Sequence, residues 1–247
     1  MNPGFLVLAN VLLLTRLVCL FRDDANRGSL WAAKAAVELA ALGVLYPCSR
    51  ASLAAAAVIV AFNLLGWRGE KSSSRKNFLR LRHGLLLLVC LSFCFAPGAA
   101  LAFRPGLVRF AAEFADWTAL GPLFRSLGGA EVQLFLFGLL LTANEANLAI
   151  RAVFDWLDLK PRSLPAGGGV VDVGEFNRGR VIGMLERALL YVFLLQGQYG
   201  AIGFVLAAKA FTRFKALDDR PFAEYVLIGT LLSACCALGV AAAVRLA

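Results

Sequence analysis

Charged side chains occur inside the most apolar stretches of this sequence. Glu186 and Arg187 lie in the first half of the apolar run 181–213, and another acid and base, Glu145 and Arg151, lie where a second run ends. Ionisable groups inside membrane-length segments are costly and usually face the interior of a helix bundle or a water-filled cavity. These residues are therefore either structural salt bridges or part of a binding site.

The functional interpretation is a polar vestibule that faces the cytoplasm. Asn144, Asn147 and Arg151 share one helical face at spacings of i, i+3 and i+7. Lys209 and Arg213 are spaced i, i+4 where the run 181–213 ends. Such a group of amides and charges suits a small ion or an anionic head group. The candidate vestibule residues are Asn144, Glu145, Asn147, Arg151, Glu186, Arg187, Gln196, Gln198, Lys209, Arg213 and Glu224.

A specific pairing is expected between the two runs. Glu186 and Arg187 should lie about six residues, or ~9 Å, inside the membrane at 1.5 Å per helical residue. Arg151 and Glu145 should meet them at this shallow depth, so that Glu186 pairs with Arg151. Removing one partner of a buried ion pair can cost ~3–5 kcal/mol. The pairing would therefore matter for stability even if it served no other purpose.

Metal, cofactor and enzymatic chemistry have little support in the sequence. The cysteines form no C-x-x-C motif, and His83 is the only histidine. The stretch GGGVVDVG lacks the G-K-[ST] of a phosphate-binding loop, and the chain lacks G-x-S-x-G and H-E-x-x-H. We predict no metal site, no cofactor and no catalytic residue. A membrane-embedded lipid-modifying enzyme stays a secondary alternative.

The elements that position these residues are expected to cross a membrane. Hydrophobic residues make up 60% of the 247-residue chain and charged residues 17%, whereas soluble domains carry about 25% charged residues. Several apolar windows can cross a hydrocarbon core of ~30 Å as helices. The predicted fold is all-α, a polytopic transmembrane helix bundle with about six spans plus a helical hairpin. The predicted spans are 4–21, 30–47, 51–67, 84–103, 131–150 and 222–244.

The placement of basic residues predicts the topology. The net charge is +9, and the loop 68–83 is dense in Lys and Arg, so it should be cytoplasmic. Counting spans from this loop puts the N-terminus outside. A single crossing by 181–213 would place Lys209 and Lys215 outside, whereas a turn at 196–200 returns them to the cytoplasm. The charge bias therefore favours a hairpin, either re-entrant or made of two short spans, and predicts no nucleic-acid partner.

A single transmembrane domain over residues 1–247 is predicted. Phe110, Phe114 and Trp117 fall on one stripe of an amphipathic segment, a pattern typical of a helix that lies in the membrane interface. Three segments differ from simple spans. They are this interfacial helix at 104–126, a cytoplasmic loop at 157–178 and the hairpin at 179–214.

Small residues in the hairpin predict close helix packing. Gly179 and Gly183 are spaced i, i+4, as are Gly203 and Ala207. Faces of small residues let membrane helices approach one another closely. We therefore expect the hairpin arms to pack against neighbouring helices through these two faces.

Three short motifs in the C-terminal part resemble a known family. They are I-G-x-L-E-R (Ile182 to Arg187), A-K-x-x-x-R (Ala208 to Arg213) and E-Y-x-L-I-G-T-L-x-S (Glu224 to Ser233). Their order and spacing resemble the C-terminal half of a family of uncharacterised bacterial integral membrane proteins defined by a domain of unknown function. The resemblance covers residues 179–240. It implies a bacterial inner (plasma) membrane and supplies no activity.

The leading functional prediction is a transporter- or channel-like integral membrane protein. It would bind or move a small ion or an anionic head group through the vestibule. The alternative is a non-catalytic membrane subunit or regulatory protein, for which the helix at 104–126 would be the docking element. The predicted partners are membrane lipids, together with a homo-oligomer or a membrane partner subunit. The predicted location is a bacterial inner membrane, crossed several times, with the N-terminus outside.

Overall fold

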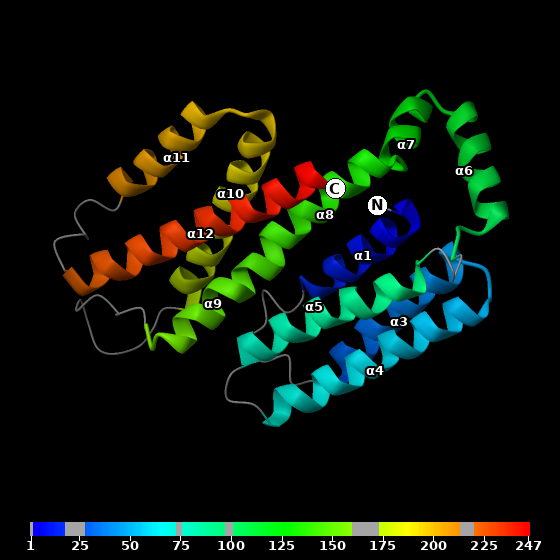
Figure 1. The fold of residues 1–247 in the computed structure, drawn as a ribbon, viewed down its shortest axis with the longest axis horizontal. Helices are drawn as coiled ribbons and strands as arrows, with labels where there is room; N and C mark the ends of the chain where they lie inside the picture. Colours follow the sequence, from blue (N-terminus) through cyan, green and yellow to red (C-terminus); the bar gives the residue numbers. More distant parts are fainter. Residues whose placement is uncertain (1, 18–27, 73–75, 97–100, 160–172, 213–219) are drawn as a thin grey trace. The chain divides into compact units, whose positions relative to one another are not determined.

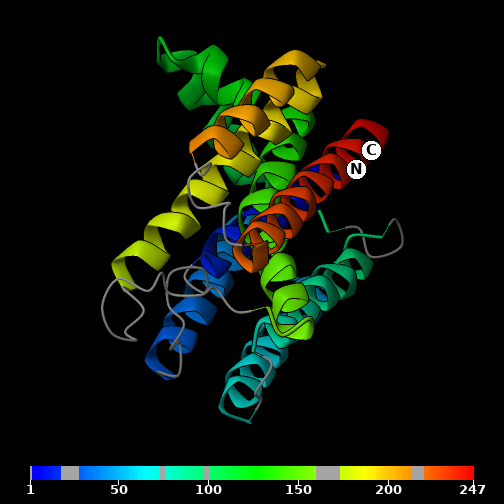
Figure 2. The same cartoon turned by 90° about the vertical axis from the view of Figure 1, so that its left-hand side faces the viewer.

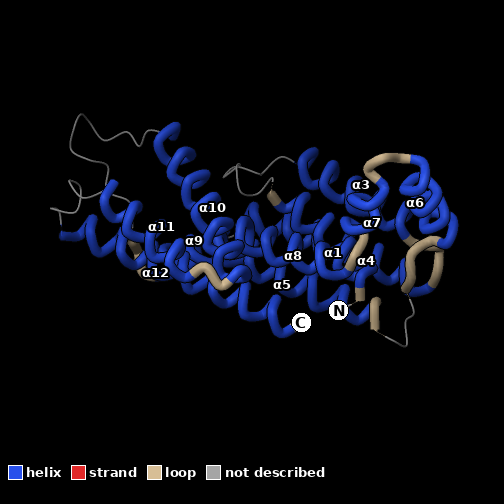
Figure 3. Tube along the Cα trace, turned by 90° about the horizontal axis from the view of Figure 1, so that it is seen from above, coloured by secondary structure: helices blue, strands red, loops and turns tan. Residues whose placement is uncertain are grey.

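Helices make up the whole regular structure of the described chain (Figure 3). The computed structural model describes residues 2–17, 28–72, 76–96, 101–159, 173–212 and 220–247. The predicted all-α class is confirmed for these residues. Five of their helices are long and apolar enough to cross a membrane, which fits a multi-pass membrane protein. These candidate spans are Gly28–Leu45, Arg50–Glu70, Lys76–Cys94, Ala130–Trp156 and Ala223–Leu246.

The chain divides into two compact units, Met1–Leu140 (unit 1) and Leu141–Ala247 (unit 2). Unit 1 runs from blue to green in Figure 1. Its first helix starts with a cap, because the Asn2 side chain accepts a hydrogen bond from the Gly4 amide at 2.8 Å. The helices of unit 1 are α1 (Pro3–Arg16), α3 (Gly28–Leu45), α4 (Arg50–Ser72), α5 (Lys76–Cys94), α6 (Pro105–Trp117), α7 (Gly121–Leu127) and α8 (Ala130–Leu140).

The core of unit 1 lies among α1, α3, α4 and α5. Leu12, Ile59 and Leu91, from three of these helices, are almost fully buried in one apolar cluster. At one end of the cluster the buried hydroxyl of Tyr46 donates to the carbonyl of Gly4 at 2.6 Å. This bond ties the segment after α3 to the first turn of α1. Removing large apolar side chains from such a core typically costs ~2–5 kcal/mol each.

The connection between α4 and α5 is more helical than predicted. The predicted span 84–103 is wrong at both ends, because the helix is Lys76–Cys94. Most of the predicted loop 68–83 also belongs to α4 or α5. Glu70 on α4 and Arg80 on α5 explain the difference. Their side chains are only 3% and 4% exposed and form an ion pair, with Oε1 and Nε 2.5 Å apart. The charged ends of the two helices therefore pack together instead of unwinding into water.

The predicted interfacial segment 104–126 consists of two short helices, α6 and α7. Gly121 lies where they meet, and a Cβ atom there would be 1.8 Å from the carbonyl oxygen of Ala115. Only glycine allows so close an approach. The rings of Phe114 and Phe124 lie edge to face at 5.4 Å. The expected aromatic stripe is exposed within this unit, and Trp117 is 91% exposed. Its position in a membrane interface stays a prediction.

Unit 2 contains the broken apolar run of the sequence. The chain passes from α8 directly into a π-helix and then into further α-helices. In Figure 2 the consecutive helices α10 and α11 are drawn in yellow to orange and α12 in red. The elements of unit 2 are η1 (Leu141–Glu145), α9 (Ala146–Trp156), α10 (Val173–Gln196), α11 (Tyr199–Thr212) and α12 (Arg220–Leu246).

A glycine turn separates α10 from α11. Gly197 has a φ of 71°, in the left-handed region that favours glycine. The amide of Gln198 donates to the carbonyl of Phe193 at 2.9 Å, and that of Gly197 donates to Leu194 at 3.2 Å. This pair of bonds is the Schellman motif that ends α-helices. The glycine-rich break in the apolar run is therefore a helix stop followed by a new helix.

The bounds of this helix pair differ from the predicted hairpin. Helix α10 begins at Val173, so the end of the predicted loop 157–178 is helical. Helix α11 ends at Thr212, and residues 213–214 lie outside the described residues, as do 160–172 of the loop. At 1.5 Å per residue, α10 is about 36 Å long and α11 about 21 Å. The two arms are therefore unequal, and only α10 has the length of a membrane span.

Helices α10 and α12 pack side by side and run in the same direction. Near its middle, α10 carries Arg187, which interacts electrostatically with Cys236 of α12. Near its end, the Leu195 carbonyl accepts a hydrogen bond from Arg245 of α12. The pair that comes earlier along α10 also comes earlier along α12, as it must in parallel helices. The turn at Gly197 therefore lies beside the C-terminal end of a candidate membrane span.

Candidate functional site

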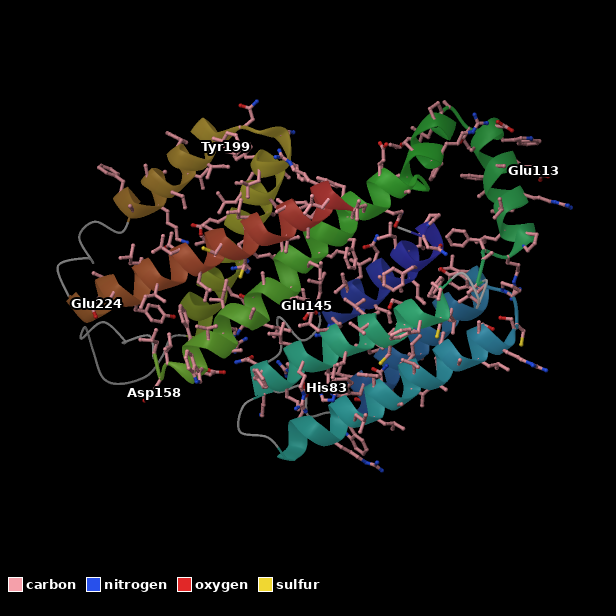
Figure 4. The ribbon with its side chains drawn as sticks, viewed as in Figure 1. His83, Glu113, Glu145, Asp158, Tyr199 and Glu224 are labelled. Carbon is pink, nitrogen blue, oxygen red and sulfur yellow. The ribbon has the colours of Figure 1, made fainter. Side chains whose placement is uncertain are left out.

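A buried cluster of polar side chains surrounds the π-helix η1. Arg187 reaches it from α10 and is 4% exposed. Its Nε donates to the Thr142 carbonyl at 3.1 Å, and its Nη2 donates to Asn147 Oδ1 at 3.3 Å. Asn144 Nδ2 donates to Glu145 Oε1 at 3.2 Å, and Glu145 is labelled in Figure 4. We call these five residues the arginine–amide cluster.

The π-helix explains how a backbone carbonyl takes part in the cluster. A π-helix closes i→i+5 hydrogen bonds, so its backbone is out of register with the α-helices on either side, and such turns are frequent at functional sites. The sequence LTANE (Leu141 to Glu145) follows a run of leucines and adopts this form. The guanidinium of Arg187 then supplies a donor to the Thr142 carbonyl. Arg187 of α10 is thus hydrogen-bonded to the backbone of η1.

The cluster lies near the middle of its helices. Arg187 is about 14 residues after the start of α10 and about nine before its end, or ~21 Å and ~14 Å of helix. Thr142 and Asn147 lie in the central part of the candidate span Ala130–Trp156. The expected depth of ~9 Å in the membrane was counted from the start of the apolar run and stays a prediction, although α10 itself begins earlier, at Val173. Arg187 therefore sits at mid-length of a span-sized helix.

Glu186 does not have the expected partner. Its carboxylate forms an ion pair with Lys209 of α11, and both side chains are mostly buried, at 17% and 18% exposed. The expected pairing with Arg151 is therefore wrong. Successive residues of an α-helix point about 100° apart, since there are 3.6 residues per turn. Glu186 consequently faces the other hairpin arm while Arg187 faces η1.

Three of the remaining predicted vestibule residues, Gln196, Gln198 and Glu224, lie at helix ends away from the cluster. Arg151 is half-buried on α9. Gln196 and Gln198 are exposed at the turn after α10, about nine or more residues beyond Arg187. Glu224, labelled in Figure 4, is exposed near the start of α12. Arg213 lies outside the described residues. The structure therefore separates the predicted site into a central cluster, one ion pair and two helix ends.

Two amide atoms of the cluster have no hydrogen-bond partner among the described residues. They are Asn144 Oδ1, an acceptor, and Asn147 Nδ2, a donor, and both are buried. An unsatisfied buried polar group costs ~1–3 kcal/mol. A bound water or a small polar ligand is the usual partner of such groups. The cluster therefore has spare hydrogen-bonding capacity of both kinds.

A second buried network, in unit 1, is complete without a ligand. Glu38 is 0% exposed and accepts hydrogen bonds from Thr15 Oγ1 at 2.6 Å and Asn63 Nδ2 at 2.7 Å. Lys34 Nζ is 2.6 Å from Glu38 Oε1 and donates to Asn63 Oδ1 at 2.9 Å. The i, i+4 spacing of Lys34 and Glu38 signals this pair in the sequence, but the contributions of Thr15 and Asn63 need the fold. This network ties α1, α3 and α4 together.

The small-residue faces of the hairpin do not pack as expected. A Cβ atom added at Gly179 or Gly203 would meet no described atom within 4 Å. At Gly183 it would meet only Nη1 of Arg187, at 3.5 Å. The prediction of close packing through these glycines is therefore wrong. The first face instead leaves open space beside the arginine.

Neither metal ligands nor similar proteins point to a function for this site. Among the described residues, no group of three or more His, Cys, Asp or Glu side chains could hold a metal ion. The geometry of the arginine–amide cluster is therefore the main indication of function. No protein-family model, curated protein or solved structure matches the chain.

Proposed function

We propose that this chain is a transporter- or channel-like membrane protein that binds a small ion or an anionic head group at the arginine–amide cluster. The supporting observation is the buried Arg187 at mid-length of α10, set against a π-helix in the middle of a candidate span. Substrate sites of many secondary transporters lie near the bilayer midplane at interrupted helices. Ionisable residues inside a membrane are functional-site candidates by default.

The competing interpretation is a structural cluster that only ties helices together. The Glu38 network of unit 1 shows what such a cluster looks like in this chain, because both carboxylate oxygens have close donors. Buried polar groups in folded proteins are nearly always satisfied in this way. The arginine–amide cluster differs, since its bonds are longer and two amide atoms are unpaired. This contrast favours a ligand site.

The proposed location is a bacterial inner membrane with the N-terminus outside. The resemblance of the C-terminal motifs to uncharacterised bacterial membrane proteins supports the compartment. The basic segment 68–83 supports the orientation, because Lys and Arg concentrate on the cytoplasmic side. In this orientation α9 ends and α10 begins at the cytoplasmic face. A ligand from the cytoplasm would reach the cluster from those ends.

A role as a membrane subunit is the second candidate. It is favoured by the exposed aromatic face of α6 and α7, where Phe110 is 66% and Trp117 is 91% exposed. An exposed apolar patch of this kind marks an interaction with lipid or protein. Co-purification of a second membrane protein that is lost when Trp117 is replaced by Ser would support this role.

Flux through reconstituted protein tests the leading proposal. Proteoliposomes are loaded with isotopically labelled phosphate, acetate, Na⁺ or K⁺, and efflux is compared with that of protein-free liposomes. We expect efflux of at least one probe, reduced at least tenfold by Arg187→Gln. Arg109→Gln is the matched control, because the same change is made at an exposed position of α6. No efflux of any probe, or equal efflux with the wild type and with Arg187→Gln, contradicts the proposal.

A further inference from the structure

One nitrogen of the Arg187 guanidinium, Nη1, makes no hydrogen bond to the described residues. A guanidinium carries five N–H donors on three nitrogens. In Arg187, Nε bonds to Thr142 and Nη2 to Asn147, whereas Nη1 has no hydrogen-bond partner among the described residues. The side chain as a whole is 4% exposed. A buried cation therefore keeps an unused pair of donors.

Gly183 leaves room in front of these donors. Side chains of a helix lean toward its N-terminus and cover the residue four positions earlier, which for Arg187 is Gly183. A Cβ atom at Gly183 would lie 3.5 Å from Nη1 and within 4 Å of no other described atom. One turn earlier, Gly179 has no described neighbour within 4 Å. A larger residue at Gly183 would therefore place side-chain atoms beside Nη1.

The charge around the cluster favours an anion. The hydrogen bonds of the buried Arg187 guanidinium go to two neutral acceptors, the Thr142 carbonyl and Asn147 Oδ1. The neighbouring carboxylate of Glu186 is paired with Lys209 of α11. A buried cation is costly unless an opposite charge compensates it.

Hydrogen-bond chemistry points in the same direction. Two possible ligands for a cation, the Thr142 carbonyl and Asn147 Oδ1, already accept from Arg187. Two donors keep no hydrogen-bond partner among the described residues, Nη1 of Arg187 and Nδ2 of Asn147, against one acceptor, Asn144 Oδ1. The planar guanidinium matches the geometry of carboxylate and phosphate oxygens. An oxyanion would use these donors, whereas a metal cation would be repelled by them.

We infer that the ligand of the arginine–amide cluster carries an oxyanion, a phosphate or carboxylate, which reaches Arg187 Nη1 across the Gly179–Gly183 face of α10. This inference rests on the proposed function and specifies the ligand class of the same site. The same chemistry is offered by the headgroup of an anionic phospholipid and by a soluble phosphate or carboxylate. Both sources are therefore included in the test.

The decisive variant is Gly183→Leu in the full-length protein. The substitution places a branched side chain over Nη1 without changing any charge, and leucine favours helix over glycine. Gly203→Leu on α11 is the matched control, since that position is equally open but faces no arginine among its neighbours. Thermal unfolding of both variants checks that they fold like the wild type.

Binding is measured in two kinds of lipid nanodisc. In phosphatidylcholine discs, labelled inorganic phosphate, acetate, Na⁺ and K⁺ are titrated separately. In discs that also contain phosphatidylglycerol, native mass spectrometry counts the lipid retained after mild detergent release. We expect the wild type to bind phosphate or acetate, or to retain phosphatidylglycerol. Gly183→Leu should weaken that binding at least tenfold and Gly203→Leu should leave it unchanged.

The outcomes separate this inference from the proposed function. Phosphate or acetate binding in phosphatidylcholine discs identifies a soluble anion, and selective retention of phosphatidylglycerol identifies a lipid headgroup. Binding of Na⁺ or K⁺ alone overturns the oxyanion assignment and leaves ion transport intact. Equal oxyanion binding by wild type and Gly183→Leu overturns the approach across Gly183. Binding of no probe, together with no efflux from proteoliposomes, contradicts both.

Discussion

Arg245, near the end of α12, donates a hydrogen bond from Nη2 to the carbonyl of Leu195, in the last turn of α10, at 3.0 Å. The same nitrogen bonds to Leu194. A cation at the carboxyl end of a helix satisfies free carbonyls and complements the helix dipole. The contact therefore places the turn after α10 beside the C-terminal end of the candidate span Ala223–Leu246, far from its start.

The topology can be tested by labelling Gln198→Cys in a cysteine-free background. We expect an impermeant thiol reagent to label this position in intact cells, because the turn should face outward. Trp156→Cys, at the exposed end of α9, should be labelled only after the cells are permeabilised. The reverse pattern would invert the topology. Protection of both sites would place the turn within the membrane, as in a re-entrant loop.

The turn itself makes a prediction about stability. Gly197→Ala should destabilise the protein by about 1 kcal/mol, because alanine disfavours the positive φ that the Schellman motif needs. Gly200→Ala serves as the control, since Gly200 is helical and has open space around it, so alanine there should be neutral or slightly stabilising. Unfolding in mixed detergent micelles measures both changes. Equal effects at the two positions would contradict this account of the turn.

The ion pair between Glu186 and Lys209 can be isolated by a double-mutant cycle. Glu186→Gln and Lys209→Gln should each destabilise the protein, and the double variant should lose less than their sum. A coupling energy of ~0.5–3 kcal/mol is typical of residues in contact. The same cycle with Glu186→Gln and Arg151→Gln should show additive effects. Coupling with Arg151 instead would restore the pairing expected from the sequence.

The aromatic face of α6 and α7 predicts the depth of Trp117. In a variant whose other three tryptophans are phenylalanine, Trp117 should be quenched most strongly by lipids labelled near the headgroup. Indole rings prefer this level, and the segment lies between two candidate spans, α5 and Ala130–Trp156. Strongest quenching by lipids labelled at the chain ends would place it in the bilayer centre. Absence of lipid quenching would favour contact with a protein.

Sequence periodicity predicted the helices well because apolar windows of membrane length have few alternative structures. It predicted Glu145, Asn147 and Arg187 as members of one polar site for the same reason, since charges in such windows must meet. It did not predict the π-helix, because nothing in the sequence LTANE indicates that its Thr142 carbonyl accepts a hydrogen bond from Arg187 of another helix. It also misassigned Glu186, because which helix lies on which side of α10 is a property of the assembled unit.

The start of α10 was misjudged for a related reason. The hydrophobic run begins at about residue 181, but the helix begins at Val173. The polar residues before residue 181 lengthen the helix, but they do not lengthen the apolar window by which the helix is recognised in the sequence. The buried pair of Glu70 and Arg80 had the same effect on α4 and α5. Charged helix ends that find partners across a helix pair cannot be told from loops by composition alone.

The ring formed by Lys34, Glu38 and Asn63 has a consequence for biogenesis. A lysine or an acid near the centre of an inserting helix costs ~2.5–3.5 kcal/mol at the translocon, and α3 carries both. Asn63 of α4 bonds to both side chains, and only a short turn separates α3 from α4. The two helices can therefore leave the translocon as one preassembled pair, in which Lys34 and Glu38 neutralise each other and Asn63 supplies hydrogen bonds to both.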